Sequence, residues 1–110
     1  MKNEKKLFQQ GDVLIYSVDP KEISGEKKTI EARARGFVLA DGEVTGHAHV
    51  IQDPNVKMFN IGNKMFLEAT KTVTVVHEEH NPIEIPAGTY EIGRVQEYDH
   101  FTEEARQVRD

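Results

Sequence analysis

Four of the five histidines in this 110-residue sequence lie in two short segments. His47 and His49 are separated by one alanine, and His77 and His80 are separated by two glutamates. Imidazole nitrogens bind transition metals, and they exchange protons near neutral pH. These two segments are therefore the candidate site for a divalent metal ion or for acid–base catalysis.

The first pair lies within a segment, residues 43–51, whose composition predicts a β-strand. Side chains alternate across a strand, so His47 and His49 are expected on one face, with their Cα atoms about 7 Å apart. Rings at that spacing can reach one ion through bonds of about 2.0–2.1 Å. One face of this strand is expected to pack as core, and in a barrel the histidine face could be the lumen.

The second pair follows a strand expected over residues 72–77. His77 and His80 cannot point the same way on a regular strand, because two residues separate them. Pro82 indicates a turn here, and a turn would let the two imidazoles converge. The candidates for an additional carboxylate ligand are Asp53, Glu78 and Glu91.

The sequence contains no cysteine, which excludes a disulfide, a thiolate nucleophile and a thiolate metal site. Nitrogen and oxygen ligands suit Zn, Fe(II), Mn or Ni as the divalent metal. An open coordination position would allow Lewis-acid chemistry on a small-molecule ligand, as in a metal-dependent enzyme. The simplest compartment for such a chain is the cytoplasm, and the fifth histidine, His100, is interpreted as an ordinary polar residue.

Two other functions fit the same residues. Metal-free histidines could act as base and acid on a phosphodiester, with Arg33, Arg35 or Arg94 binding a phosphate. That chemistry needs imidazoles that flank a substrate-sized gap, whereas chelation needs ring nitrogens within about 3–3.5 Å of one another. Alternatively, the chain is a non-catalytic binding or structural module of a phage or mobile element, and its histidines belong to a polar interface.

The elements that must position these histidines predict an all-β fold in a single domain, residues 1–110, with 1–6 and 102–110 peripheral. About eight short segments rich in β-branched and aromatic residues alternate with turn residues, which is typical of a small antiparallel barrel or sandwich. Hairpin turns are expected at Asp41–Gly42 and Gly62–Asn63. Phe37, Tyr90 and Ile92 are expected in the core. The strands are expected at residues 13–18, 29–40 with a bend at Gly36, 43–51, 56–61, 64–69, 72–77, 83–85 and 89–98, and a short C-terminal helix at 102–108.

Part of this pattern resembles the small metal-binding cupin barrels. Their first motif combines a glycine, HxH, a carboxylate and a second glycine, and the matching residues here are Gly42, His47, His49, Asp53 and Gly62. Their second motif, P-x-G-x-x-H, is matched from Pro86 to Tyr90, but Glu91 stands where the family has histidine. The resemblance implies a cupin-like or jelly-roll fold and a divalent metal, with His77 or His80 as the third histidine ligand. Residues 44–49, 77–90 and 96–98 are also similar to a family of small uncharacterised bacterial and phage proteins, which implies no function.

The net charge of −5 at pH 7 makes nucleic acid an unlikely partner, because binding to phosphates relies on clustered Lys and Arg. No apolar run approaches the roughly 20 residues that span a bilayer, so no membrane partner is expected. The charged N-terminus is followed by no apolar stretch, so we expect no cleaved signal peptide. Alternating charged residues at 29–35 would protect a sheet edge or pair with a second subunit, which leaves a homodimer open.

Overall fold

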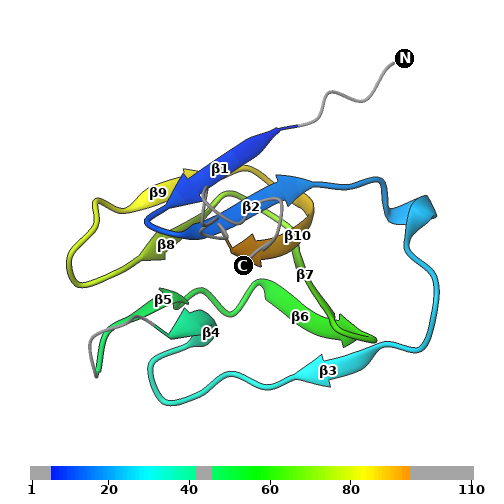
Figure 1. Ribbon diagram of the computed structural model, residues 1–110, viewed down its shortest axis with the longest axis horizontal. Coiled ribbons are helices and arrows are strands. Elements are labelled where there is room, and N and C mark those ends of the chain that lie inside the picture. Colours follow the sequence, from blue (N-terminus) through cyan, green and yellow to red (C-terminus); the bar gives the residue numbers. More distant parts are fainter. Residues whose placement is uncertain (1–5, 42–45, 95–110) are drawn as a thin grey trace, which may run out of the picture.

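The computed structural model describes residues 6–41 and 46–94, which form ten β-strands and one short 3-10 helix (Figure 1). The first half of the chain forms β1 (Leu7–Gln10), β2 (Val13–Ser17), the 3-10 helix (Pro20–Glu22), β3 (Lys28–Ile30), β4 (Phe37–Asp41) and β5 (Ala48–Ile51). The second half forms β6 (Val56–Ile61), β7 (Lys64–Ala69), β8 (Val73–Val76), β9 (Ile83–Ile85) and β10 (Gly88–Arg94). Among the described residues, no helix is long and apolar enough to cross a membrane.

The strands build two antiparallel sheets. One sheet has the order β1-β2-β10-β7-β6-β3, and the other has the order β4-β5-β8-β9. The edge strands β1 and β9 contact each other, so the N-terminal hairpin reaches the second sheet (Figure 1). The all-β antiparallel prediction is confirmed. Because the two sheets of the described chain do not close on themselves, the arrangement is closer to a sandwich than to a closed barrel.

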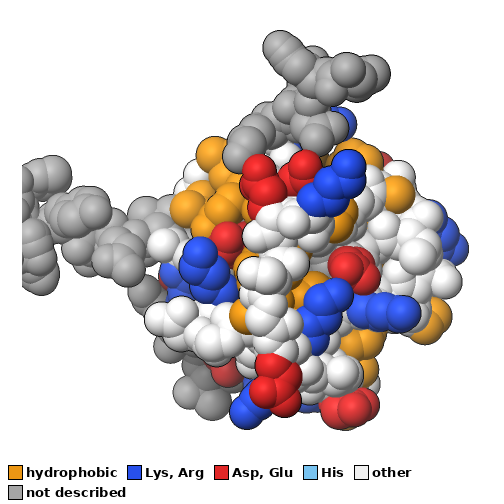
Figure 2. Space-filling view, turned by 90° about the vertical axis from the view of Figure 1, so that its right-hand side faces the viewer, with side chains coloured by type: hydrophobic (Ala, Val, Ile, Leu, Met, Phe, Trp, Pro, Cys, Tyr) orange, Lys and Arg blue, Asp and Glu red, His pale blue; other side chains and the backbone are white. Residues whose placement is uncertain are grey.

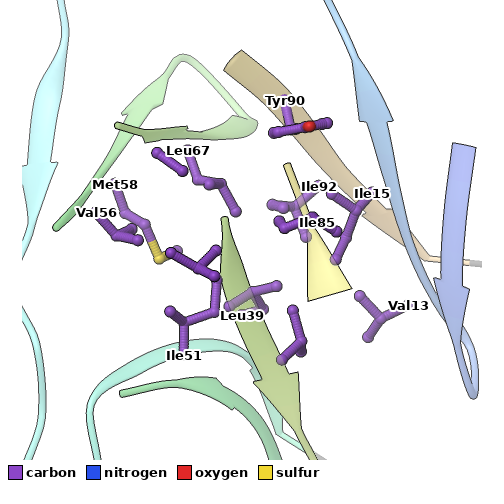
Figure 3. Packing of buried hydrophobic residues seen from close by; sticks show 13 residues of the cluster. Val13, Ile15, Leu39, Ile51, Val56, Met58, Leu67, Ile85, Tyr90 and Ile92 are labelled. Atoms are coloured by element: carbon purple, nitrogen blue, oxygen red, sulfur yellow. The ribbon is translucent and has the colours of Figure 1, made fainter. Parts of the chain in front are cut away.

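The hydrophobic core lies between the two sheets (Figure 3). Ile15 and Leu67 from the larger sheet, and Ile51 and Ile85 from the smaller one, have no exposed surface. Each such side chain contributes about 1.5–3 kcal/mol when it leaves water, so their burial holds the sheets together. Tyr90 and Ile92 belong to this core as predicted, and the partly buried Phe37 packs against it.

The single strand predicted over residues 29–40 is wrong. The chain forms β3 and β4 instead, and between them Arg33 and Gly36 exchange two backbone hydrogen bonds of 2.8 and 3.0 Å across a tight turn. Residues 31–35 alternate between alanine and charged residues, but all five are exposed, so no apolar face is buried that would hold a strand there. Alanine also has a low preference for strands. Gly36 has φ of 121°, and a Cβ there would lie 2.6 Å from the carbonyl oxygen of Ile51. The turn therefore depends on glycine.

Other boundaries also differ from the predicted ones. Asp41 pairs with Ala48, so residues 42–47 separate the two strands and the expected two-residue turn at Asp41–Gly42 is wrong. The strand that carries His49 begins at Ala48 and not at residue 43. The hairpin at Gly62–Asn63 is confirmed by the pairing of Ile61 with Lys64. Residues 95–98, His100 and the expected helix at 102–108 lie outside the described residues.

We expect Gly36→Ala to lower the free energy of unfolding by about 2–4 kcal/mol, because the variant adds an overlap with backbone to the strain of a positive φ. Gly62→Ala is the matched control, since Gly62 has φ of 62° and its Cβ would meet nothing within 4 Å. The control should lose about 1–2 kcal/mol. Urea unfolding of both variants measures the difference, and equal losses would show that the contact with Ile51 has no energetic weight.

Candidate metal centre

Three segments meet at one end of the sandwich, on the left of Figure 1: the start of β5, the β8–β9 connection and the β1–β2 turn. They bring together the four histidines of the two sequence pairs. Figure 2 shows the opposite side of the molecule, where acidic, basic and hydrophobic side chains are interspersed and no histidine is visible among the coloured residues. The histidines are therefore concentrated on one side.

His77 is the centre of the cluster. Its ring centroid lies 4.3 Å from that of His49, 4.7 Å from that of His80 and 5.7 Å from that of His47. Two imidazoles on one tetrahedral ion, with bonds of about 2.0–2.1 Å, have centroids about 5 Å apart. The observed distances thus suit rings that share an ion, and they leave no substrate-sized gap between His77 and its neighbours.

His49 points into the interior of the sandwich. All four residues of β5 are buried, and Ile51, which lies on the same face as His49, belongs to the core between the sheets. The imidazole of His49 is only 2% exposed. Of the two faces that the sequence allowed for this strand, the histidine face is the inner one. His47 precedes β5, and its side chain is 23% exposed.

The chain turns between His77 and His80, as the proline after them predicted. The Nδ1 atom of His77 accepts a 3.0 Å hydrogen bond from the backbone N–H of Glu79. An ion bound at this nitrogen would replace that hydrogen bond. The ring of His80 lies against Gly11 of the β1–β2 turn, where a Cβ would come within 2.6 Å of its Nε2 atom. Only glycine leaves room for His80 in this position.

Gln10 fixes the proton on His49. Its side-chain Nε2 donates hydrogen bonds of 2.9 Å to the carbonyl oxygens of Val75 and Asn81, so its Oε1 must face the Nδ1 atom of His49, 2.9 Å away. Because an amide oxygen can only accept, Nδ1 of His49 carries the proton and Nε2 carries a free lone pair. Metal-binding histidines are commonly oriented in this way by a hydrogen bond on their other nitrogen.

The lone pair of His49 faces a carboxylate. Its Nε2 atom lies 3.8 Å from Oδ1 of Asp12. The other oxygen of Asp12 accepts hydrogen bonds of 2.7 and 3.3 Å from Arg94. The hydrogen bond from Arg94 holds the pKa of Asp12 below its ordinary value, so this carboxylate is charged at neutral pH.

Glu78 ties the β8–β9 connection to the start of β5. One carboxylate oxygen accepts a 3.0 Å hydrogen bond from the backbone N–H of Ala48, and the other pairs with Arg35. Arg35 also donates a 2.7 Å hydrogen bond to the carbonyl oxygen of Gly46. The pKa of Glu78 falls to about 2, chiefly because of the bond from Ala48 and also because of Arg35. Glu78 is therefore an oriented anion next to His77.

Of the three candidate carboxylates, Glu78 joins the histidines, whereas Asp53 and Glu91 lie elsewhere. Asp53 lies beyond the other end of β5, where its Oδ1 accepts hydrogen bonds from the backbone and side chain of Asn55. Glu91 lies between the core residues Tyr90 and Ile92 on β10, so it points to the outer face of the larger sheet. Asp12, which the sequence analysis did not single out, is the second carboxylate of the cluster.

Burial keeps the imidazole of His49 neutral at neutral pH. Burial, followed by the neighbouring His77, lowers the pKa of His49 from 6.5 to about 4, and Asp12 only partly opposes this. Among the residues that the structure describes, none offers a hydrogen bond to the buried Nδ1 of His47, and a carboxylate oxygen of Glu79 lies 3.5 Å from it. Nitrogen and oxygen atoms of His47, His77 and Glu78 lie within 4.8 Å of one another, so a contraction of roughly 1 Å or more would bring them to the spacing of metal ligands.

The arginines proposed for phosphate binding are each paired with a carboxylate. Arg33 lies 3.7 Å from Asp41, and Arg35 and Arg94 bind Glu78 and Asp12. Each guanidinium therefore already has a carboxylate partner, although all three side chains are exposed.

Sequence reasoning also missed Gln10. A polar residue before the turn glycine Gly11 is usually an exposed surface residue, and no local pattern distinguishes a buried one. The only signal was Gly11 itself, which marks a turn but not the ring of His80 that packs on it. These contacts join residues far apart in the sequence.

A family model described as "Domain of unknown function (DUF8820)" matches residues 9–95 of this chain. The match covers the β1–β2 turn and both histidine segments. Neither the curated proteins nor the solved structures contained a match to this sequence.

The depressed pKa of His49 predicts how stability depends on pH. Between about pH 4 and 6.5 the unfolded chain binds a proton on this imidazole and the folded protein does not, so stability should rise with pH over that range. The slope from this group approaches about 1.4 kcal/mol per pH unit. Urea unfolding in the presence of EDTA should show that slope in the unmodified protein and a shallower one in His49→Gln. Parallel curves would contradict the assignment.

Proposed function

This chain belongs to the DUF8820 family, a domain of unknown function, and we propose that it binds a divalent transition metal at the histidine cluster. The observation that carries the proposal is the convergence of three imidazoles on His77, at 4.3–5.7 Å between ring centroids. Imidazolium rings at this spacing would repel one another strongly. Neutral imidazoles that surround one cation turn the same arrangement into an attractive one.

The first ligand set consists of His47, His77 and Glu78, whose ligand atoms lie within 4.8 Å of one another. A bound ion needs nitrogen and oxygen atoms about 3–3.5 Å apart, so this set must contract by roughly 1 Å or more. His77 and Glu78 lie in a connection between strands, which can adjust more easily than β5. An ion would also satisfy the buried Nδ1 atom of His47, for which residues 6–41 and 46–94 supply no hydrogen bond.

The ligand types limit the metal and its chemistry. Two histidines and a carboxylate, with no sulfur, suit Zn, Fe(II), Mn or Ni. Three protein ligands leave coordination positions for water or for a small molecule, which a Lewis-acidic ion would polarise. The exposed Glu79 and His80 border the cluster on its solvent side, so a ligand can approach from there. On this proposal the protein is a metal-dependent enzyme or binding protein for a small molecule, acting in the cytoplasm.

Metal-free acid–base catalysis has less support. An acid and a base must stand on opposite sides of a substrate, but the ring of His77 packs against those of His49 and His80. A phosphodiester would also need a free cationic side chain, and Arg35 and Arg94 are paired with carboxylates. A purely structural role of the histidines is less consistent with the buried Nδ1 atom of His47, which receives no hydrogen bond within the described part of the chain.

Untagged protein, freed of metal with EDTA, tests the proposal by titration with Zn²⁺, Mn²⁺, Ni²⁺ and anaerobic Fe²⁺. We expect tight binding of at least one of these ions, with a rise in the midpoint of thermal unfolding, because a ligand that binds only the folded state stabilises it. His47→Ala and His77→Ala should each weaken binding at least about 100-fold, since each removes a direct ligand.

Glu84→Gln is the matched control, because Glu84 is an exposed carboxylate on β9 outside the cluster. Its affinity for the ion should equal that of the unmodified protein. Failure of the unmodified protein to bind or to be stabilised by any of the four ions would overturn the proposal, as would equal weakening in the control.

A further inference from the structure

We propose that Arg35 is the positioning residue of the metal centre, because it keeps the carboxylate of Glu78 and the backbone at His47 within reach of one ion. This role rests on the proposed function, since it concerns the affinity of the same centre. Arg35 is not a ligand itself, because a guanidinium has only donors and no lone pair to offer a metal.

The guanidinium of Arg35 joins two segments of the centre. Its Nη1 atom donates a 2.7 Å hydrogen bond to the carbonyl oxygen of Gly46, the residue directly before His47. Its Nη2 atom pairs with Oε2 of Glu78. A planar guanidinium can hold two acceptors in fixed relative positions, which a single ammonium cannot do. Arg35 therefore sets the position of the Glu78 carboxylate relative to the segment that carries His47.

The carboxylate of Glu78 completes the connection on the other side of His47. Its Oε1 atom accepts a 3.0 Å hydrogen bond from the backbone N–H of Ala48, the residue directly after His47. The backbone is thus held on both sides of His47, by Arg35 before it and by Glu78 after it. Because Glu78 directly follows His77 in the chain, this one ion pair relates all three proposed ligands to one another.

Arg35 extends from a well-packed turn. Two backbone hydrogen bonds between Arg33 and Gly36 close this turn. At Gly36 the turn packs against the end of β5, where an added Cβ would lie 2.6 Å from the carbonyl oxygen of Ile51. The side chains of Arg35 and Glu78 are 46% and 33% exposed. An ion pair with this exposure adds little to overall stability, so its removal should affect the metal centre more than the fold.

The positive charge of Arg35 also opposes ion binding, because a guanidinium repels a divalent cation nearby. The negative charge of Glu78 offsets that repulsion. A carboxylate that is already held in place also loses less freedom when it binds an ion. We therefore expect positioning to outweigh repulsion, and the sign of the change in affinity decides between the two effects.

The experiment compares two arginine variants of the same turn. Arg35→Met keeps the aliphatic part of the side chain and removes both hydrogen bonds. Arg33→Met is the matched control, because Arg33 pairs with Asp41 and not with a proposed ligand. Metal-free full-length protein is titrated with whichever of Zn²⁺, Mn²⁺, Ni²⁺ and Fe²⁺ the unmodified protein binds. We expect Arg35→Met to bind about 10–100-fold more weakly and Arg33→Met to bind like the unmodified protein.

A double-mutant cycle distinguishes positioning of the ligand from a general loss of structure. Glu78→Gln keeps the two histidine ligands and should retain weak, measurable binding. In that background Arg35→Met should weaken binding by less than about 3-fold, because most of its effect passes through the carboxylate. Equal losses from Arg35→Met in the unmodified and the Glu78→Gln backgrounds would overturn the positioning role.

The outcomes separate this role from the proposed function. If the unmodified protein binds none of the four ions, the proposed function fails and the role of Arg35 fails with it. If the unmodified protein binds an ion and Arg35→Met binds it equally or more tightly, only the role of Arg35 is overturned. If Arg35→Met does not fold, Arg35→Lys replaces it, with an expected loss of about 10-fold because one ammonium cannot hold both acceptors. Unchanged affinity in Arg35→Lys would then contradict the proposal.

Discussion

The side-chain amide of Gln10 connects different parts of the fold, because its nitrogen and its oxygen form hydrogen bonds with different segments. Gln10 is 2% exposed, and its three hydrogen bonds reach β8, the β8–β9 connection and β5. An unsatisfied buried donor or acceptor costs about 1–3 kcal/mol, so these bonds strongly favour one arrangement of the four segments. The amide thereby joins the edge of the larger sheet to the smaller sheet and selects one tautomer of His49.

The cluster next to Gln10 combines a neutral imidazole with charged carboxylates. The buried imidazole of His49 is neutral, while Asp12 and Glu78 are charged and each is paired with an arginine. Arg94 binds one carboxylate oxygen of Asp12, and Arg35 binds one of Glu78. The backbone N–H of Ala48 binds the other oxygen of Glu78. On the proposed function, such a centre would attract small cations more than anions, because it presents nitrogen and oxygen atoms that carry lone pairs.

The features that the sequence predicted are those with local causes. The Gly62–Asn63 hairpin, the turn between His77 and His80, and the core positions Tyr90 and Ile92 all follow from patterns within a few residues. The features that the sequence did not predict have non-local causes. Gln10 contacts Val75 and Asn81 across 65 and 71 positions of the chain. The break in the strand expected at 29–40 depends on which residues are buried, and alternation alone does not show that.

The N-terminal strand β1, which ends next to the histidine cluster, is an edge strand of the larger sheet. β1 lies at the edge of its sheet, pairs with β2 alone in that sheet, and begins with Leu7, which is 64% exposed. Gln10 is the last residue of this strand. Separation of β1 from the sheet would therefore break the hydrogen bond between Nδ1 of His49 and the side chain of Gln10. If the centre binds an ion as proposed, its occupancy and the fraying of the first hairpin are thermodynamically linked. Loss of β1 from the edge of its sheet would then weaken ion binding without any change to an imidazole.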